Sequence, residues 1–463
     1  MNSSVNSQQS MEEPASSRRA APLSRATHAV LHASMITLGI IFVFDVITQP
    51  GWVTEDFRSF YLAGWAARLD LPIYDPNTLR ELGAILGLDL PIHPYLYPPP
   101  LAYAATALAR LSPAAAQVVW WFAGILLITP ATTLLAVRIG ARGDSEGRPR
   151  EFALPELCLS FMTAGFLLWM FNVRSNLWWG QVNPIIVAFI LFATLAHFNK
   201  NGVACGALLG IAASIKMTPA LLLLYFCADR SLWRPVLAGF AASLAACFVA
   251  TLPFGGYSAW LAFIDQVPRM SHGAFIPGLF PSSSPANFSL AGFFSRIVGD
   301  ETLAMKVLTY AVILALLAPI LLRLWRTRRD PTGRLLLLGP LSIVMVIGSP
   351  LAYAHHVLYL LPGAMLQLVF AIRSGNVKYA AGLPALFAIV ATDFPAYYYR
   401  FKLGPTANQL VTSMNLYALL ALYFVGMRFA ALATSAASEA QPAESERPIS
   451  HPSARHEPLI QLR

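Results

Sequence analysis

Apolar runs recur along almost the whole of this 463-residue chain, and several are long enough to cross a lipid bilayer. A perpendicular helical span needs about 20 apolar residues, and shorter or proline-broken segments are tolerated only where protein or a wet cavity covers them. We therefore expect an all-α, polytopic membrane protein with about 11 to 13 membrane-spanning or half-spanning helices. The runs lie near residues 28–48, 98–110, 115–137, 154–172, 182–198, 203–215, 218–228, 233–252, 302–323, 335–349, 354–372, 377–392 and 412–430.

Charged residues support this prediction by their scarcity and their position. Only 12% of the residues are charged, about half the share of roughly 25% in soluble domains. The net charge is +9, and the basic residues lie in short loops between apolar runs, which is the positive-inside pattern of cytoplasmic loops. Nucleic-acid binding would need basic and aromatic residues gathered on a soluble face, so no nucleic-acid partner is expected.

The four cysteines lie inside apolar segments, without the spacing of a metal site. We expect buried, inert thiols rather than a disulfide or a metal centre. They are Cys158, Cys205, Cys227 and Cys247.

The basic loops predict which side of the membrane each segment faces. Residues 138–150, 323–334 and 373–378 are basic and are assigned to the cytoplasm. The helix count between them then requires residues 98–110 to be a short segment that dips into the membrane without crossing it. The segments expected to face outward are 49–97, 173–181, 253–301, 349–355 and 393–411.

One membrane domain between two tails is the expected domain organisation. Residues 1–27 and 433–463 are rich in Ser, Ala, Glu and Pro, and we expect both to be disordered cytoplasmic tails. Residues 28–432 form the membrane domain. Its first run, 28–48, is expected to stay as a membrane helix of the cytoplasmic (inner) membrane, with Asp45 making a helix-end hydrogen bond.

The stretch TEDFRSFY (54–61) places charged side chains beside the expected outer membrane boundary. A carboxylate next to a bilayer is costly unless it is wet, paired or used, so Asp56 is a candidate general base facing a lipid-side cavity. The alternative is a solvated Asp56, or one paired with the neighbouring Arg58. Glu55 and Asp75 are competing candidates for the base.

Apolar residues in 57–69 recur at helical spacing around two arginines. This pattern predicts an outward-facing amphipathic helix lying on the membrane. Tyr61 lies within it and is a candidate for contact with a sugar or an acceptor.

An amide pair stands in WWGQVNP (178–184), at the outer end of an apolar run. Gln181 and Asn183 lie beside two tryptophans, and amides beside aromatic rings suit sugar hydroxyls. Both are therefore candidates for binding sugar or acceptor. The alternative is that they cap the next helix, with Pro184 in its first turn.

A lysine interrupts the apolar stretch SIKMTP (214–219). Lys216 either extends its ammonium group to the membrane interface or binds an anionic partner, for which a lipid-linked phosphate is suitable. Pro219 breaks the segment, so Lys216 is expected at the outer end of two half-helices.

Two adjacent histidines end SPLAYAHH (349–356), and NFSLAGFF (287–294) lies in the large outward loop. Neighbours on a helix point about 100° apart, so His355 and His356 are weak metal ligands. One of them is a candidate for binding phosphate or sugar while the other packs, and the alternative is that both lie at the interface. Asn287 is expected either to organise its loop or to contact substrate.

These stretches occur in one order over residues 56–356: DFRSFYLAGWAARL, IYDP, YPPP, WWGQVNP, SIKMTP, NFSLAGFF and SPLAYAHH. In this respect the chain resembles the membrane-integral GT-C glycosyltransferases, and among them glycosyltransferase family 87, which use polyprenyl-phosphate sugars. One departure is Tyr353, which stands where the family pattern would have a tryptophan and puts sugar stacking there in question.

The resemblance implies a GT-C fold and transfer of a hexose, mannose by family association, from a polyprenyl-phosphate sugar to a hydroxyl of an extracytoplasmic glycolipid or glycan. It implies that Asp56 is the base and that Lys216, His355 and His356 lie near the donor phosphate. We expect inversion at the sugar, no metal, no cofactor, and an active site facing the periplasm or exterior. The alternative is a transporter or flippase of lipid-linked sugars, which would need no base.

Overall fold

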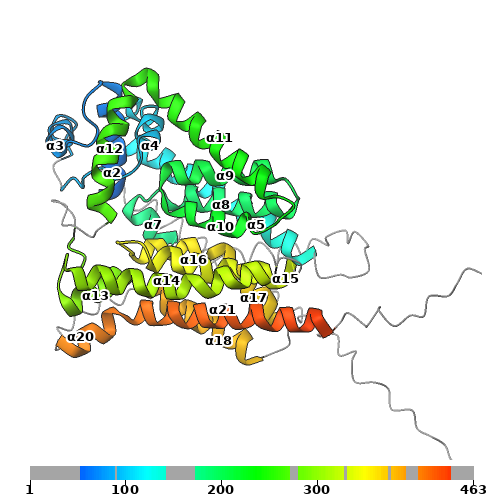
Figure 1. Ribbon diagram of the computed structural model, residues 1–463. Helices are drawn as coiled ribbons and strands as arrows, with labels where there is room; N and C mark the ends of the chain where they lie inside the picture. The colour runs from blue at the N-terminus through cyan, green and yellow to red at the C-terminus, as the bar shows by residue number, and fades with distance from the viewer. Residues whose placement is uncertain are drawn as a thin grey trace, which may run out of the picture.

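The computed structural model describes residues 53–88, 91–141, 173–271, 280–327, 331–373, 377–392 and 405–439. These ranges contain helices and no strand, so the all-α prediction is confirmed (Figure 1). The helices before residue 272 are α2 (Glu55–Arg68), α3 (Pro76–Ile85), α4 (Pro99–Ala105), η1 (Leu108–Arg110), α5 (Pro113–Ala141), α7 (Val173–Trp179), α8 (Asn183–Phe198), α9 (Gly202–Ile215), η2 (Thr218–Leu222), α10 (Leu223–Phe226), α11 (Trp233–Thr251), η3 (Leu252–Phe254) and α12 (Gly256–Ser271). Those after it are α13 (Leu290–Val298), α14 (Leu303–Arg326), α15 (Pro331–Leu336), α16 (Leu338–Ile347), η5 (Ala354–Leu360), α17 (Leu361–Arg373), α18 (Val377–Ala391), α20 (Pro405–Thr412) and α21 (Met414–Glu439).

The predictions for 1–27, 28–48 with Asp45, 154–172 with Cys158, and 440–463 lie outside the described residues. The second tail was predicted to begin at residue 433, but helix α21 continues to Glu439. The other three cysteines are free thiols as predicted, but only Cys205 is buried, while Cys227 and Cys247 are half-buried.

Nine described helical segments are apolar enough to explain a membrane location. Five are long enough to cross a bilayer: Pro113–Leu135, Trp233–Thr251, Leu303–Arg326, Ala354–Ala371 and Met414–Thr434. Four are shorter: Asn183–Phe198, Gly202–Ile215, Gly333–Ile347 and Gly382–Ala391. The protein is therefore a polytopic membrane protein, with half-length helices among full-length ones, as predicted.

The helices form two groups that pack against each other (Figure 1). In the first group, α8 and α9 lie side by side with α5 and α11. The backbones of α9 and α11 approach so closely that a Cβ on Gly206 would overlap the carbonyl oxygen of Val236. Small residues at such contacts are typical of helices packed inside membranes.

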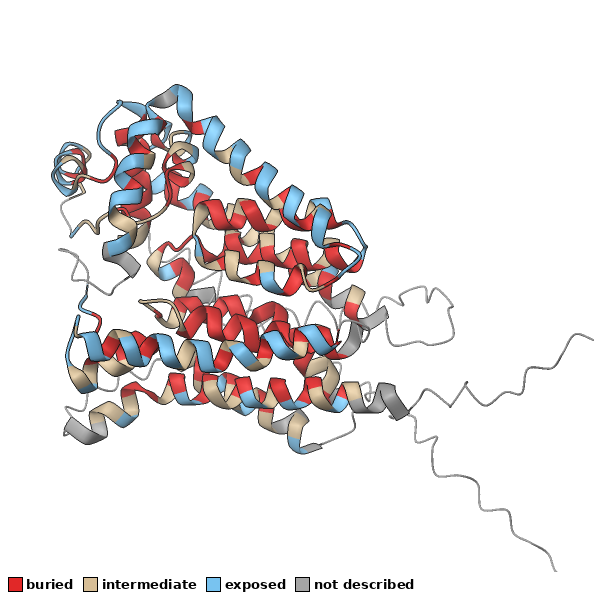
Figure 2. Cartoon of the chain, viewed as in Figure 1, coloured by how far each residue is buried: buried red, intermediate tan, exposed pale blue. Residues whose placement is uncertain are grey.

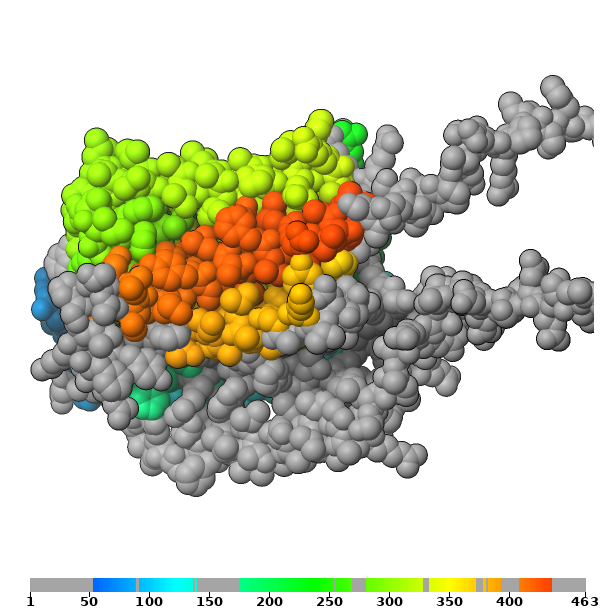
Figure 3. All heavy atoms as spheres, turned by 90° about the horizontal axis from the view of Figure 1, so that it is seen from below, coloured from blue at the N-terminus to red at the C-terminus, as the bar shows by residue number. Residues whose placement is uncertain are grey.

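The second group is built around α16, which is buried along its whole length, and includes α14, α17, α18 and α21. Seen from below, α14 and α21 run side by side, and Tyr423 of α21 donates a hydrogen bond to the Leu316 carbonyl of α14 at 2.6 Å (Figure 3). The outer helices α11 and α14 expose large apolar side chains, including Val249 and Leu314, as lipid-facing helices do (Figure 2).

Short elements gather at one end of both groups, where α2, α4, α7, α12 and α13 lie (Figure 1). Residues 98–110 form only α4 and η1, too short to cross, before the single long helix α5. Helix α2 forms where the amphipathic helix was predicted, but the prediction that it lies on the membrane is wrong. Phe57, Arg58 and Phe60 are all buried, so protein covers opposite faces of the helix. Helix α12 instead exposes an apolar face, with Tyr257 and Leu261 one turn apart.

Local sequence signals set several helix ends near the site. Asp75 accepts hydrogen bonds from the backbone N–H groups of Asn77 and Thr78 and so begins α3. Ser289 begins α13 in the same way through the N–H of Gly292. These ends hold the short elements in fixed positions around the site.

A buried ion cluster lies at the opposite end of the molecule. The Asp229 carboxylate, between α10 and α11, accepts from Arg334 of α15 at 2.9 Å and from Lys200 at 3.3 Å. His197 at the end of α8 lies 3.7 Å from the same oxygen. The cluster therefore joins the two helix groups at the end farthest from the short outward elements.

Candidate active site

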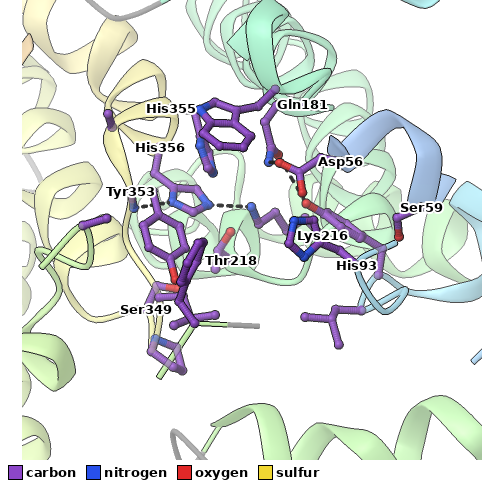
Figure 4. A pocket seen from close by; sticks show the side chains of 18 of the residues that line it. Asp56, Ser59, His93, Gln181, Lys216, Thr218, Ser349, Tyr353, His355 and His356 are labelled. Atoms are coloured by element: carbon purple, nitrogen blue, oxygen red, sulfur yellow. Dashed lines mark hydrogen bonds between the residues drawn. The ribbon is translucent and has the colours of Figure 1, made fainter. Parts of the chain in front are cut away.

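A cavity of about 540 Å³ opens at the end where the short elements gather. Five of the predicted site residues line it, from four separate parts of the chain: Asp56, Gln181, Lys216, His355 and His356. Figure 4 shows Asp56 and Gln181 on one side, the histidines on the other, and Lys216 between them. The rest of the wall is largely apolar, including Phe263 and Val267 of α12.

Asp56 lies in the first turn of α2, with its side chain directed into the cavity (Figure 4). The side-chain amide of Gln181 donates a hydrogen bond to its carboxylate. Burial raises the pKa of Asp56 to about 6, although His93, Gln181 and Lys216 each act to lower it. A carboxylate with a pKa near neutrality is suited to accept a proton.

The competing acids have other surroundings. Glu55 lies 3.1 Å from His93 Nε2, and Asp75 caps α3. Neither lines the cavity. Arg58 donates to two backbone carbonyls, including that of Val53 at 2.8 Å, rather than forming the ion pair with Asp56 that was the alternative.

Lys216 lies where α9 ends and before η2 begins, at the predicted break between two half-helices. Its Nζ is 2.8 Å from His356 Nε2 and lies over the rings of Tyr97 and Tyr359, 5.5 and 5.8 Å from their centroids. Burial lowers the pKa of Lys216 to about 7, although Asp56 acts to raise it. The lysine therefore faces the cavity and does not extend away from it.

Asn183 lies behind Lys216, fully buried in the first turn of α8. Val182, not Asn183, is the cap of that helix, so the capping alternative is wrong for Asn183. The Asn183 amide nitrogen donates to Asn176 Oδ1 at 2.9 Å, and its oxygen accepts from Tyr359 at 2.9 Å and from Lys216 at 3.4 Å. Asn183 therefore orients the lysine from below the cavity wall.

The two histidines lie in η5, a tight helix directly after the outward segment 349–353. Their ring centroids are 4.3 Å apart, so the two imidazoles lie side by side at the cavity wall. His356 Nδ1 accepts the backbone N–H of Tyr353 at 2.9 Å. The Tyr353 ring, in place of the expected tryptophan, stacks near His356 and lines the cavity (Figure 4).

Besides Asn183, two more predicted site residues do not line the cavity. Tyr61 is buried in α2 and donates to the carbonyl of Leu111 at 2.7 Å. Asn287 is fully buried and bonds the backbone of the outward loops, accepting from Ala352 N–H at 2.9 Å and donating to the Pro350 carbonyl at 3.1 Å. These bonds fit the alternative in which Asn287 organises its loop.

Other residues at the site were not singled out from the sequence. Tyr97 donates to the Gln181 oxygen at 3.3 Å, and His93 lies on the wall beside it. Asn176 and Tyr359 hold Asn183. Only Tyr359 could have been found from the sequence, because it follows His356 by one helical turn. The other contacts join segments that are distant in the sequence.

In the described part of the chain, no group of three or more His, Cys, Asp or Glu side chains is arranged to hold a metal ion. Among the described residues that line the cavity, Lys216, His93 and the N–H donors near the lysine can compensate a negative charge.

Comparison with known proteins gives relatives of one kind. The chain is 26% identical to a polyprenol-phosphate-mannose-dependent alpha-(1-2)-phosphatidylinositol mannoside mannosyltransferase of Mycolicibacterium smegmatis, over 73% of this chain and 78% of that protein. It is 27% identical to the protein of that name from Mycobacterium tuberculosis, over 70% and 72%. A pentamannoside mannosyltransferase of Mycobacterium tuberculosis is 26% identical, over 75% and 74%. No solved structure matches the chain significantly.

The sequence model of glycosyltransferase family 87 matches residues 95–351, more than half of the chain. The matched region contains Gln181 and Lys216, while Asp56 and the two histidines lie outside it and meet them in space. The expected resemblance is therefore confirmed, and this membrane protein belongs to glycosyltransferase family 87.

Proposed function

We propose that this protein transfers mannose from polyprenyl-phosphate mannose to a hydroxyl of a glycolipid, on the outer side of the cytoplasmic membrane. The observation that carries the proposal is that one cavity holds both a carboxylate able to accept a proton, Asp56, and a nitrogen pair suited to a phosphate, Lys216 and His356. The donor and the glycolipid class follow the names of the mannosyltransferase relatives.

In this reaction, Asp56 removes the proton from the acceptor hydroxyl. The hydroxyl oxygen attacks the anomeric carbon from the face opposite the phosphate, so the configuration at that carbon inverts. The bond from the anomeric carbon to the phosphate oxygen breaks, and its electron pair leaves with the lipid phosphate. Lys216 and His356 stabilise the charge that develops on that leaving group, and Gln181 holds the Asp56 carboxylate in place.

Three other predicted residues support this machinery in the proposal. Asn183 orients Lys216 through a hydrogen bond, and Asn287 holds the outward segment before the histidines. Tyr61 anchors α2, which carries Asp56, to the short segment between η1 and α5. Each is a positioning residue, because its own side chain does not line the cavity and its polar atoms bond other protein groups.

The ends of the molecule support an outward-facing site. The cavity and the short outward elements share one end, and the ion cluster of Asp229 and Arg334 lies at the other, beside the basic segment assigned to the cytoplasm. We propose that residues 28–432 form the membrane domain and that α12 lies at the outer interface, where its exposed apolar face meets lipid.

The test uses purified protein in sealed lipid vesicles with radiolabelled polyprenyl-phosphate mannose and candidate acceptors, phosphatidylinositol mannosides first. A labelled glycolipid with a new glycosidic bond, inverted relative to the donor, is the expected product. A lipid-linked sugar transporter would move the donor between leaflets without forming that bond. If no sugar-accepting lipid becomes labelled while donor crosses the membrane, the transferase proposal is wrong.

The matched variants are Asp56→Asn and Glu55→Gln. Removing a general base costs about 10²–10⁴-fold in rate, so Asp56→Asn is expected to lose transfer by that factor while still binding donor. Glu55→Gln, one residue away and outside the cavity, should keep most activity. Normal turnover by Asp56→Asn would show that Asp56 is not the base.

A further inference from the structure

Both ring nitrogens of His356 are engaged, and the two contacts together fix where its proton lies. On one side, the backbone N–H of Tyr353 points at Nδ1 across 2.9 Å. On the other side, Nε2 lies 2.8 Å from the Nζ of Lys216 (Figure 4). A backbone N–H can only donate, so Nδ1 must act as the acceptor and carry no proton.

An imidazole without a proton on Nδ1 is neutral and carries its proton on Nε2. That proton points at the lysine nitrogen. An ammonium group has three donors and no lone pair, so two donors would then face each other across 2.8 Å. A neutral amine has a lone pair and resolves the conflict, because Lys216 then accepts from His356 and still donates to Asn183 Oδ1 at 3.4 Å.

We infer that Lys216 is a neutral amine until the donor binds, and that it takes up one proton from water when the donor phosphate enters the cavity. The inference rests on the proposed function in taking the anion to be the phosphate of a lipid-linked sugar. With the phosphate present, the lysine ammonium and the Nε2–H of His356 both donate to phosphate oxygens, and the conflict between them ends.

The groups that surround Lys216 agree with this assignment. Those packed around it are Asp56 from α2, Tyr97 and His93 from segment 91–98, Tyr359 from the turn after His356, and His355. Of these, Asp56 is the acid, and its carboxylate bonds Gln181. Burial outweighs the attraction to Asp56 and lowers the pKa of the lysine to about 7, so a neutral amine is accessible at physiological pH.

This arrangement gives the enzyme a cation that forms together with the complex. The donor phosphodiester carries one negative charge, and the departing lipid phosphate carries about 1.5 to 2. A proton gained on binding is therefore in place when that extra charge develops, and the protein avoids holding a buried, unpaired ammonium before the donor arrives.

The first experiment measures the protonation of Lys216 without donor. Amine labelling by a small acylating reagent is followed at the Lys216 peptide by mass spectrometry, from pH 5 to 11. In the folded protein, the labelling rate should rise with a midpoint near pH 7, whereas in the unfolded protein the same peptide should show the ordinary lysine value of about 10.4. A folded midpoint near the unfolded one would overturn the inference.

The second experiment counts protons by calorimetry in buffers of different ionisation enthalpy. The probe is a short-chain prenyl-phosphate mannose, a phosphodiester that does not titrate near neutrality, so any proton gained is bound by the protein. Uptake should approach about one proton per donor at pH 8 and fall at lower pH, where the lysine is already protonated.

Two variants show which residue takes up the proton when the probe binds. Lys216→Arg keeps a permanent charge and should bind the probe without proton uptake, while Asp56→Asn should retain uptake at pH 8. Uptake that persists in Lys216→Arg, or that is absent from the unmodified protein when it binds the probe, contradicts the inference. Failure of the probe to bind contradicts instead the proposed function, and the labelling midpoint still decides the state of Lys216.

Discussion

Gln181 reaches from the segment before α8 to donate its side-chain amide to the Asp56 carboxylate of α2, so residues 125 positions apart form one unit. The Gln181 oxygen in turn accepts from Tyr97, which fixes the direction of the amide. The carboxylate is thus both oriented and kept more acidic than burial alone would leave it. Because Asp56 must be ionised to act as the base, the fall of the transfer rate at acidic pH reports the pKa of this carboxylate.

The pH dependence of transfer is expected to follow Asp56. A base acts only when ionised, and burial raises the pKa of Asp56 to about 6, so at saturating donor the rate should rise with pH through about 6 and level off above it. In Gln181→Leu the hydrogen bond that lowers the pKa of Asp56 is lost, so the rise of the rate should move to higher pH. A bond to a charged group contributes about 1.5–3 kcal/mol, so at pH 6 we expect a loss of about tenfold or more.

Initial rates in nanodiscs between pH 5 and 8.5 measure this shift. Ser59→Ala is a suitable control, because Ser59 also lines the cavity but no hydrogen bond joins it to Asp56. If the rate of Gln181→Leu rises over the same pH range as that of the natural protein, the titrating group is not Asp56.

Gly180 is expected to tolerate no side chain. Its φ is +70°, and a Cβ there would overlap Thr54 Oγ1 and lie 2.5 Å from the Cβ of Phe57, at the start of α2. Gly180→Ala should push α2 away from Gln181 and lower transfer by at least about 100-fold, because misplacement by about 1 Å can cost that much.

The matched control is Gly87→Ala. Gly87 has the same φ of +70°, but a Cβ added there would have no neighbouring atom within 4 Å. It should show only the backbone cost of about 1–2 kcal/mol and near-normal activity. Equal loss of activity in both variants would mean that backbone strain, not contact with α2, explains the effect.

Asn287 should act on stability and loop position rather than on sugar affinity alone. Its amide nitrogen donates to the carbonyls of Ser282 and Pro350, and its oxygen accepts from two N–H groups, including that of Ala352. Asn287→Leu leaves these buried groups without partners, at about 1–3 kcal/mol each, and should lower the thermal unfolding temperature and the rate together.

Asn287→Asp separates the two sets of bonds, since it keeps the acceptors and loses the donors. It should fall between the natural protein and Asn287→Leu in unfolding temperature. A variant that unfolds at the normal temperature but has a raised KM for donor or acceptor would instead assign Asn287 to substrate contact.

The Asp229 cluster is expected to stabilise the end of the molecule opposite the site. Burial acts to raise the pKa of Asp229, but hydrogen bonds from Ser231 and the charges of Arg334 and Lys200 lower it to about 2. A lowered carboxyl pKa stabilises the fold above the unfolded value of about 3.9, and this contribution is lost as pH falls toward 2. The shift corresponds to about 2 kcal/mol, which Asp229→Asn should remove at pH 7.

Arg334→Ala should cost more, about 3–5 kcal/mol, because it leaves a buried carboxylate without its main partner. Lys200→Ala should cost under about 1 kcal/mol, because the Lys200 side chain is 62% exposed. The unfolding temperatures of the three variants, measured in detergent, rank how strongly each substitution destabilises the protein. An Lys200→Ala variant less stable than Arg334→Ala would show that the cluster is organised differently.

Individual residues show how far the sequence could predict the site. Lys216 and Asp56 are detectable because a charge in an apolar region is costly and must have a partner or a use. The break after Lys216 follows from the nearby Pro219 and was found. By contrast, Asn183 was predicted to bind sugar or acceptor, or else to cap a helix, and its bond to Lys216 was not foreseen. Its partners Asn176, Tyr359 and Lys216 come from three different segments.

The sequence by itself determined the fold class and the family of this protein. Apolar runs separated by basic loops are sufficient to predict membrane helices, because burial in lipid depends on composition and length. Helix α2 shows the limit of such patterns, since the same spacing of apolar residues fits a helix on a membrane and a helix buried in protein. Only the tertiary structure decided that Asp56, Gln181, Lys216 and His356 share one cavity, because hydrogen bonds between distant segments depend on how helices pack, and that packing leaves no periodic signal in the chain.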